Sequence, residues 1–348
     1  MDGPKTATAL FGTEYYLDVQ SAYGTVTGTG WYASGNTAYA SAPATVPVSS
    51  GSRRAFNGWG GDASGSGTTS APILMNGPKV AIASWKLQYN LRIDSPYGTV
   101  LNAGWYDTGT KTTARLDMGT VSLGVGARAQ FQAWYGDATG TDSSGSSSIT
   151  MDHAHLVVAV WQVQYYLTIE TTFGSASGSG WYANGSFGLA SVNASIIPVS
   201  GTERQAFAGW SGDASGSSGA LSNPIPMDRP KSARATWKVE YLVRVDSDIQ
   251  VQIDGGGWYA AGTQATLRAP QEVASGGQTY RFSGWTGGVT SSATEVSVTV
   301  NGPLVVHANW ATVGILGGTT LTYGLIIVTV VIAIVIALVV ARSRRRRQ

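Results

Sequence analysis

The sequence predicts an all-β protein made of tandem copies of one small domain, followed by a single membrane-spanning helix at the C-terminus. Three observations support this fold class. Tryptophans recur at a fixed period, the apolar segments between them alternate residue by residue, and an uncharged apolar run precedes an arginine-rich end. Alternation with a period of two is typical of half-buried strands.

The tryptophans define the repeating unit. The chain has 12 of them, and they fall into three sets of four. The first set lies in Gly-Trp-Tyr, the second follows a phenylalanine by three residues, and the third ends an apolar segment. Each set recurs at roughly 75 residues, which is the size of a small domain rather than of one solenoid turn. We predict that all 12 belong to the structural core: Trp31, Trp59, Trp85, Trp105, Trp134, Trp161, Trp181, Trp210, Trp237, Trp258, Trp285 and Trp310.

The period sets the domain boundaries. The four copies span residues 13–86 (copy 1), 87–161 (copy 2), 162–238 (copy 3) and 239–310 (copy 4). Residues 1–12 resemble the end of a copy, because MDGPKTATALF aligns with MNGPKVAIASW at 75–85. We therefore expect the chain to be a fragment, the C-terminal part of a longer protein. A start codon that falls by chance at the repeat's own methionine is the alternative.

Each copy opens and closes with a strand. In the closing segment of copy 1, Ala81, Ala83 and Trp85 share one face, while the opposite face varies among the copies. The opening segment alternates in the same way, with Leu17 and Val19 on one face. Loops rich in Gly and Ser separate these segments. We expect five or six short strands per copy and no helix before the C-terminal span.

The joints between copies lack the residues of a flexible linker. From Trp85 to Ile93 the apolar alternation continues from copy 1 into copy 2 without Gly or Pro, and the next two joints do the same. Flexible linkers are rich in Gly and Ser. The sequence therefore predicts a stiff array. Domains of this size are about 30 Å across, so four in line would extend about 120 Å.

The C-terminus predicts a membrane anchor. Residues 323–341 are 19 residues without charge, enough to cross a hydrocarbon core of ~30 Å as a helix. The Arg-rich tail at 342–348 predicts a cytoplasmic end, with the repeats outside the cell. Residues 311–322 would be the juxtamembrane linker. The alternative, a tail-anchored protein with cytoplasmic repeats, would have to move five arginines across the membrane.

Composition narrows the function classes. The chain has no cysteine, which excludes disulfides and cysteine metal sites. The net charge of +2 includes five arginines of the tail, and without them 17 basic residues face 20 acidic ones, a balance of −3. A nucleic-acid surface would need basic residues clustered on the folded part. We therefore expect no nucleic-acid partner. The expected partner is the membrane, which the chain crosses once near its C-terminus.

Few residues suggest site chemistry. Asp62, Asp137 and Asp213 recur in glycine-rich loops and are weak metal candidates. Calcium takes about six to eight oxygen ligands, so an aspartate that bonds its own turn is the preferred interpretation. His153 and His155 could share a metal, but they occur in one copy only, which favours a solvated strand face. We expect no catalytic residues, no cofactor and no enzyme activity.

Two further sets of residues are candidates for carbohydrate chemistry. Asn184 and Asn193 fit the glycosylation acceptor pattern. A tyrosine follows each tryptophan of the first set and should lie on the opposite strand face. If that face is exposed, these rings could stack on sugars, although strand tyrosines are common without such a role. The four are Tyr32, Tyr106, Tyr182 and Tyr259.

The motif F-x-G-W-x-G-D-A-S-G, followed by M-x-x-P-K-x-x-x-A-x-W, resembles the divergent internalin-type B-repeat, also called the Listeria–Bacteroides repeat or bacterial repeat domain. The resemblance covers Tyr15 to Trp310. It implies a small β-grasp-like fold, a tandem array on a bacterial or archaeal surface, a spacer or adhesive role and no catalytic residues. The strand pattern itself leaves a sandwich-like fold open.

The copies depart from the motif in places. Copy 4 has Gly288 for the aspartate, Val300 for the methionine and Leu304 for the lysine. Copy 2 has His-Ala-His at 153–155 where copy 1 has Gly-Pro-Lys. These departures argue against one ligand bound identically by every copy.

The function predicted from the sequence is that of a membrane-anchored extracellular stalk, which displays an N-terminal part missing from this chain. The alternative is a cell-surface adhesin whose repeats bind glycan or a surface-layer protein. An enzymatic role would require a catalytic domain before residue 1.

Overall fold

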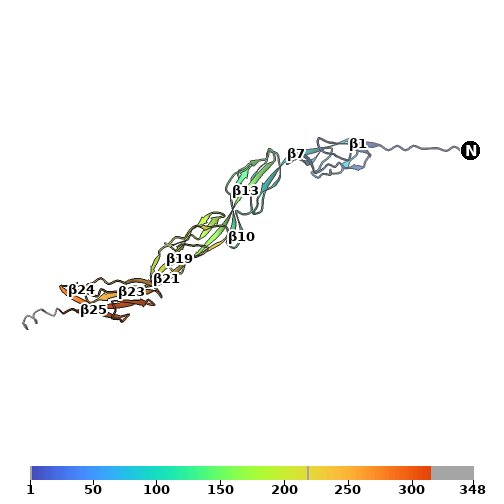
Figure 1. Ribbon diagram of the computed structural model, residues 1–348. Helices are drawn as coiled ribbons and strands as arrows, with labels where there is room; N and C mark the ends of the chain where they lie inside the picture. Colours follow the sequence, from blue (N-terminus) through green and yellow to red (C-terminus); the bar gives the residue numbers. More distant parts are fainter. Residues whose placement is uncertain (1, 218, 315–348) are drawn as a thin grey trace, which may run out of the picture. The chain divides into compact units, whose positions relative to one another are not determined.

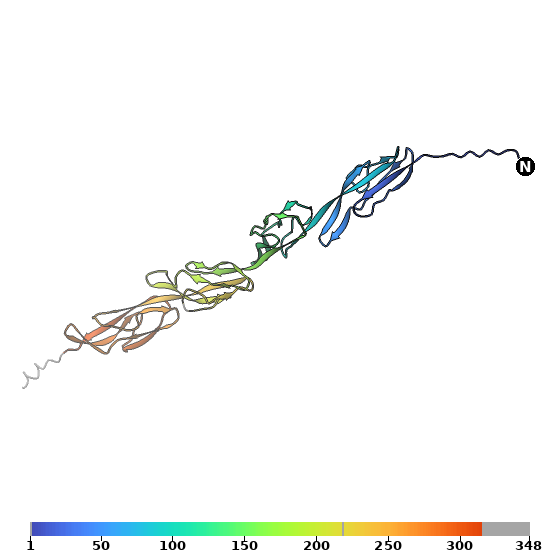
Figure 2. The same ribbon diagram turned by 90° about the horizontal axis from the view of Figure 1, so that it is seen from above.

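The computed structural model describes residues 2–217 and 219–314, and this part of the chain is all-β. Its regular elements are strands, and it holds no helix (Figure 1 and Figure 2). The all-β prediction is thereby confirmed. The predicted span at 323–341 and the tail at 342–348 lie outside the described residues. Within the described ones, no helix has the length and apolar character to cross a membrane.

Copy 1 forms a mixed five-stranded sheet in the order β2-β1-β7-β5-β4. Its two central strands, β1 and β7, are parallel, and the other neighbours are antiparallel. A separate two-stranded ladder joins β3 and β6. The strands are β1 (Glu14–Ser21), β2 (Gly30–Ala33), β3 (Thr37–Ala38), β4 (Thr45–Ser49), β5 (Ser52–Gly61), β6 (Ile73–Leu74) and β7 (Lys79–Asp94).

Copy 2 repeats this order and shares a strand with copy 1. The second half of β7 takes the place that β1 has in copy 1, and the order becomes β8-β7-β13-β11-β10, with β7 and β13 parallel. β9 pairs with β12. The new strands are β8 (Gly104–Asp107), β9 (Lys111–Thr112), β10 (Thr120–Gly124), β11 (Ala127–Gly136), β12 (Ile149–Thr150) and β13 (His155–Glu170).

The chain divides into two compact units, and the division passes through copy 3. The first holds the chain up to Leu167 with Ser179–Gly188 and Pro226–Lys231, and the second holds Thr168–Gly178, Leu189–Ile225 and the chain from Ser232 on. The strands of copy 3 are β14 (Ala176–Ser177), β15 (Gly180–Ala183), β16 (Phe187–Gly188), β17 (Ser191–Val192), β18 (Ile196–Pro198), β19 (Glu203–Gly212), β20 (Ile225–Pro226) and β21 (Lys231–Ser247).

Copy 4 lies wholly in the second unit and has the same mixed sheet. Its order is β22-β21-β27-β25-β24, with β21 and β27 parallel, and β23 pairs with β26. Its strands are β22 (Gly257–Ala260), β23 (Gln264–Arg268), β24 (Glu272–Ser275), β25 (Gln278–Gly287), β26 (Glu295–Thr299) and β27 (Leu304–Thr312). With seven strands in copy 1, one of them 16 residues long, the expectation of five or six short strands was wrong.

The core follows the alternation predicted for the first and last strands. In copy 1, Leu17 and Ala81 are fully buried and Ala83 is 5% exposed, whereas Ile82 on the opposite face is 45% exposed. Met75 is also fully buried and joins the same cluster. Small alanines leave room for one large ring beside them, which is why a domain of this size can build a dense core without disulfides.

Two of the three tryptophan sets belong to the core. The second set is buried, with exposed fractions from 1% to 8%. The third set is half-buried and packs edge-on against the phenylalanine of its own copy, as Phe56 and Trp85 do at 5.6 Å between ring centroids. The members of these sets are Trp59, Trp134, Trp210 and Trp285, then Trp85, Trp161, Trp237 and Trp310.

In copies 1, 2 and 4 the tryptophan of the first set lies outside the core cluster, and the prediction was wrong there. Trp31 is 66% exposed and Trp105 is 36% exposed, while Trp181 and Trp258 are half-buried. The neighbouring tyrosine points inward instead, because its hydroxyl finds a partner there. Tyr32 packs on the core of copy 1 and donates to the carbonyl of Gly28 at 2.8 Å.

The same reversal occurs in other copies. Tyr106 donates to the Asn102 carbonyl at 2.6 Å, and Tyr259 donates to the Gly255 carbonyl at 2.9 Å. Both tyrosines pack against their core clusters. These half-buried tyrosines therefore fit the interpretation of strand tyrosines that pack on the core, rather than the alternative of an exposed face for sugars.

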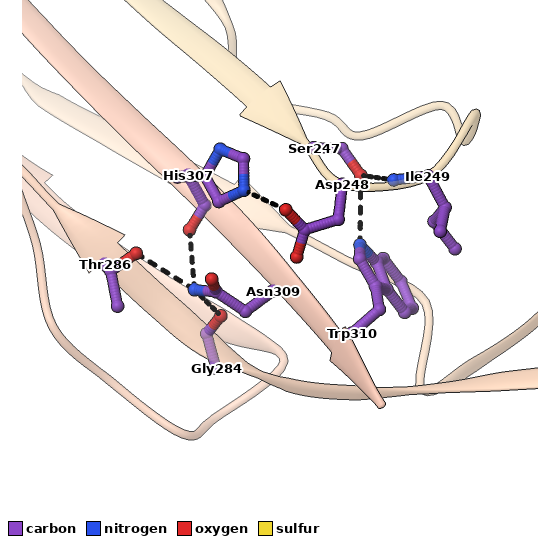
Figure 3. Close-up of polar contacts among 8 residues, drawn as sticks. All are labelled: Ser247, Asp248, Ile249, Gly284, Thr286, His307, Asn309 and Trp310. Atoms are coloured by element: carbon purple, nitrogen blue, oxygen red, sulfur yellow. Dashed lines mark hydrogen bonds and ion pairs between the residues drawn. The ribbon is translucent and has the colours of Figure 1, made fainter. Parts of the chain in front are cut away.

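An indole–hydroxyl hydrogen bond ties the last strand of each copy to the end of its first strand. In Figure 3, Nε1 of Trp310 donates to Oγ of Ser247 at 3.0 Å. The equivalent bonds are also 3.0 Å long and join Trp85 to Ser21, Trp161 to Ser95 and Trp237 to Thr171. The third tryptophan thus contributes packing and closes the parallel strand pair.

We expect Trp134→Ala to destabilise copy 2 by about 3–5 kcal/mol, because it removes a buried ring. The matched control, Trp31→Ala, should cost only about 0.5–1 kcal/mol, because most of that ring is in water. Hydrogen exchange in β11 and β13 for the first variant, and in β1 and β2 for the second, would measure local unfolding. Equal loss of protection in the two variants would contradict the assignment.

Candidate functional site: the junctions between copies

A junction strand leaves no linker between neighbouring copies. β7, β13 and β21 are 16, 16 and 17 residues long, and each runs from the closing segment of one copy into the opening segment of the next. The predicted uninterrupted run from Trp85 to Ile93 lies entirely within β7. The chain therefore passes from copy 1 to copy 2 without a loop.

The sheets of neighbouring copies overlap on this strand. Gln88 pairs with Arg53 of copy 1 on one side and with Asp107 of copy 2 on the other. Tyr89 is likewise paired on both sides, with Ser52 and Tyr106. The same overlap occurs at Gln164 and Tyr165 on β13, and at Glu240 and Tyr241 on β21. Bending at these positions would break backbone pairing on one side.

Side chains reinforce the overlap at the first junction. Arg53 Nε donates to Gln88 Oε1 at 2.9 Å, and Gln88 Nε2 donates to Asp107 Oδ1 at 2.9 Å. The guanidinium carbon of Arg53 lies 4.4 Å from the ring centroid of Trp105. Cation–π contacts contribute about 0.5–2 kcal/mol, depending on exposure. An arginine of copy 1 thus holds a tryptophan of copy 2.

The arginine clasp, defined as this arginine with its junction-strand partner and the tryptophan below it, recurs at the next two junctions. Arg128 Nε donates to Gln164 at 2.8 Å and covers Trp181 at 4.3 Å. Arg204 Nε donates to Glu240 at 2.9 Å and covers Trp258 at 4.4 Å. The clasp gives three of the four tryptophans of the first set, Trp105, Trp181 and Trp258, a partner outside the core.

Trp31 provides an internal comparison. Within the described residues no arginine lies over its ring, and the ring contacts Tyr16 at 5.2 Å between centroids. Its exposed fraction of 66% compares with 36% for Trp105, which lies under Arg53. The clasp therefore accounts for much of the difference in burial among these tryptophans.

Hairpin tips also contact the next copy. The carbonyl of Gly51 accepts the N–H of Asn90 at 3.0 Å, and a Cβ on Gly51 would lie 2.6 Å from the Cβ of Ala154. Gly51 also has a φ of +85°, which glycine adopts at little cost. Gly126 is placed similarly, since a Cβ there would lie 3.0 Å from Pro230. Glycine is thus required at these tips by backbone conformation and by space.

Charge distinguishes the junctions. At the first, the hydrogen bond from Gln88 and the Lys86 ammonium, 3.1 Å away, lower the pKa of Asp107. At the third, burial raises the pKa of Glu240, but hydrogen bonds from Arg204 and Lys238 outweigh it and the net shift is downward. The third clasp is therefore an ion pair, with Nη2 of Arg204 2.8 Å from the carboxylate.

The loop aspartates have a structural role different from the expected one. Oδ2 of Asp62 accepts the N–H of Val80 at 2.9 Å, and the N–H of Asp62 donates to the Val80 carbonyl at 2.7 Å. The aspartate thus fastens its loop to the closing strand, 18 residues away, rather than to its own turn. The Val80 hydrogen bond also lowers the pKa of Asp62. Equivalent bond pairs join Asp137 to Leu156 and Asp213 to Ser232.

Copy 4 keeps the backbone bond without the carboxylate. Gly288 donates to the Val305 carbonyl at 2.9 Å. A Cβ at Gly288 would lie 2.6 Å from the side chain of Leu304. The leucine thus occupies the space that an aspartate would need.

The remaining sequence candidates lie in separate places. Asn184 and Asn193 are exposed, and Oδ1 of Asn193 accepts the N–H of Ser175 at 2.9 Å. His155 is 8% exposed, so the expectation of a solvated strand face was wrong for it. The fold brings it beside Asp137, which is the one loop aspartate that joins a possible metal-binding group among the described residues.

The sequence reasoning missed the clasp arginines, although a signal was present. An arginine lies three residues before the phenylalanine of F-x-x-W in copies 1, 2 and 3, at Arg53, Arg128 and Arg204. Copy 4 has Thr279 there. The arginine thus occurs in each copy that another copy follows.

We expect the carboxyl group of Glu240 to titrate below its ordinary pKa of about 4.3. Its stabilisation of the junction is fully present above that value and is lost as the pH falls through the folded-state pKa. Carbon-13 NMR of glutamate-labelled chain, which has six glutamates, would measure this pKa. Arg204→Met should raise the pKa of Glu240, because the hydrogen bond from Arg204 no longer counteracts the effect of burial. A pKa in the wild type at or above the ordinary value would contradict the clasp.

One protein family matches the sequence of copy 4. Residues 241–314 match the family model described as the divergent InlB B-repeat domain. Neither the curated proteins nor the solved structures contain a match to the chain. The matched residues include the second half of β21 and all of β22–β27, with the parallel central pair and the buried Trp285. Residues 241–314 are therefore a divergent InlB B-repeat domain.

Proposed function

We propose that the chain is a membrane-anchored extracellular stalk, in which junction strands and arginine clasps keep successive copies from bending. The observation that carries the proposal is the two-sided pairing of the junction strand at Gln88 and Tyr89. A protein whose copies act independently has no need to share a strand. A stalk, in contrast, gains a fixed length and direction when its copies share a strand.

The energetics favour a stiff joint. A hinge at Gln88 would have to separate β7 from β5 or from β8, and would break the hydrogen bonds to Arg53 or to Asp107. Each hydrogen bond contributes about 0.5–1.5 kcal/mol net. Several must open together with the cation–π contact to Trp105, so bending at a junction costs several times the thermal energy.

Anchoring rests on the sequence. The uncharged run at 323–341 and the five arginines after it favour a single span with the copies outside the cell. A B-repeat domain at 241–314 suits an extracellular repeat protein. On this proposal the repeats have no catalytic role, and they display whatever precedes residue 1.

Small-angle scattering on residues 13–310 would test the stalk. We expect a maximum dimension on the order of 120 Å and a narrow distribution. A matched control with four Gly-Ser residues inserted after Tyr89 should shorten the average dimension and broaden the distribution. A compact wild-type particle, or one as broad as the control, would remove the stalk proposal and favour the adhesin alternative.

Protease treatment of intact cells would test the topology. We expect added protease to digest the copies and to leave an epitope fused after residue 348 protected, because the arginines at 342–347 should remain in the cytoplasm. A protected ectodomain with an accessible tail would show the opposite orientation. Lysed cells, in which both parts are accessible, provide the control.

The tyrosines weaken the adhesin alternative. Tyr32, Tyr106 and Tyr259 donate their hydroxyls to backbone carbonyls and pack half-buried on core clusters, so their contacts are explained by packing within each copy. A glycan or a surface-layer protein stays a candidate partner for other surfaces. Glycan-array binding that depends on exposed side chains of the copies would support it.

A further inference from the structure

His155 has a buried nitrogen without a hydrogen bond. Its side chain is 8% exposed, and Nε2 lies 3.0 Å from the carbonyl of Thr150. A carbonyl only accepts, so Nε2 carries the proton and Nδ1 carries the lone pair. Within the described chain, Nδ1 makes no hydrogen bond. A buried lone pair without a partner is unfavourable, and in this tautomer Nδ1 can bind a metal ion.

Two further ligands lie beside this nitrogen. Oδ2 of Asp137 is 3.4 Å from Nδ1 of His155, and neither atom has a proton to donate in these forms. Two ligands of a tetrahedral zinc ion are about 3.3 Å apart, given metal–ligand bonds of about 2.0–2.1 Å. His153 adds a ring nitrogen, and the ligand atoms of the three residues all lie within 4.8 Å of one another.

The third ligand, His153, can move closer to His155 and Asp137. The side chain of His153 is 64% exposed, and its ring centroid is 4.0 Å from that of His155. Its Nδ1 lies 2.5 Å from Oδ1 of Asp152. Donation to that carboxylate leaves the lone pair on Nε2. The same Asp152 oxygen is 3.4 Å from Nε2 of His155. A carboxylate that holds the second nitrogen of a histidine is a recurrent partner in metal sites.

The other copies show what an ordinary pair at this position looks like. In copy 1, Lys79 has the place of His155, and its Nζ lies 3.5 Å from Oδ1 of Asp62. A protonated His155 beside Asp137 would reproduce that ion pair with one substitution. Copy 2 differs from copy 1 at more than this position, because His153 and Ala154 also replace the Gly-Pro of copy 1. The additional change supplies the second imidazole, which an ion pair does not require.

We propose that copy 2 binds one divalent metal ion of the zinc class through His155 Nδ1, Asp137 Oδ2 and His153. Two imidazoles and one carboxylate suit zinc and its neighbours in the transition series, whereas calcium would need more oxygens. Asp137 and His155 also line an open pocket of about 460 Å³ together with Gly51 and Trp105. Water or a small ligand can complete the coordination from there.

Zinc titration of the full chain in detergent, followed by calorimetry, would test the site. We expect one equivalent per chain. Asp137→Asn keeps an oxygen for the Leu156 N–H and should weaken zinc binding at least about 10-fold. His153→Gln, at an exposed position, should weaken it by a similar factor. His155→Lys restores the pattern of copy 1 and should abolish the binding.

Two matched controls separate the site from general surface binding. Asp62→Asn alters the equivalent loop aspartate, which faces Lys79 instead of a histidine. His307→Gln removes the remaining histidine, which pairs with Asp248 at 2.6 Å (Figure 3). Both should bind zinc as the wild type does. Circular dichroism should show all five variants folded. If the wild type shows no binding, or if the copy 2 variants and the controls bind alike, the proposal is wrong.

Discussion

The tandem array depends on one constraint, the sharing of a single strand by two sheets. At Gln88 and Tyr89, β7 is paired with copy 1 on one side and with copy 2 on the other. Because side chains alternate along a strand, the register of copy 1 fixes the register of copy 2. The apolar alternation through the junction therefore does more than bury residues. It determines which face of the next copy becomes core, and a single inserted residue would turn that face to solvent.

The three tryptophan sets occupy different positions in a copy and make different contacts. The second fills the core, and the third packs against its phenylalanine and bonds the hydroxyl at the end of the opening strand. The first lies on the outer face, where the arginine of the preceding copy covers three of its four members, Trp105, Trp181 and Trp258. Arg53, Gln88 and Asp107 lie directly opposite one another on three adjacent strands, so the clasp follows from the register.

Period and alternation were sufficient to predict the strands at both ends of a copy, the buried alanines and the unbroken joints. They were insufficient for Gly-Trp-Tyr, where alternation requires one ring inside and one outside but does not say which. The tyrosine hydroxyl decides, because it satisfies a backbone carbonyl near the core. The partners of the clasp arginines and of His155 were missed for another reason. The arginines have a local signal and the histidines were separate metal candidates, but the sequence does not say what either contacts. Arg53 meets Trp105 and Asp137 meets His155 across long sequence distances, which no local pattern reports.

The position that faces the loop aspartate shows how such an array can acquire new chemistry. Asp62 with Lys79 forms an ion pair, Asp137 with His155 forms a possible ligand pair, and Gly288 with Leu304 forms an apolar contact. The backbone bond from the loop to the closing strand survives in all three. Because that backbone bond is present with or without the aspartate, the pair can change without loss of the fold. The junctions lack this freedom, since each clasp residue contacts two copies. Divergence of function is therefore expected at the loop pairs, and the arginine clasps should stay as they are.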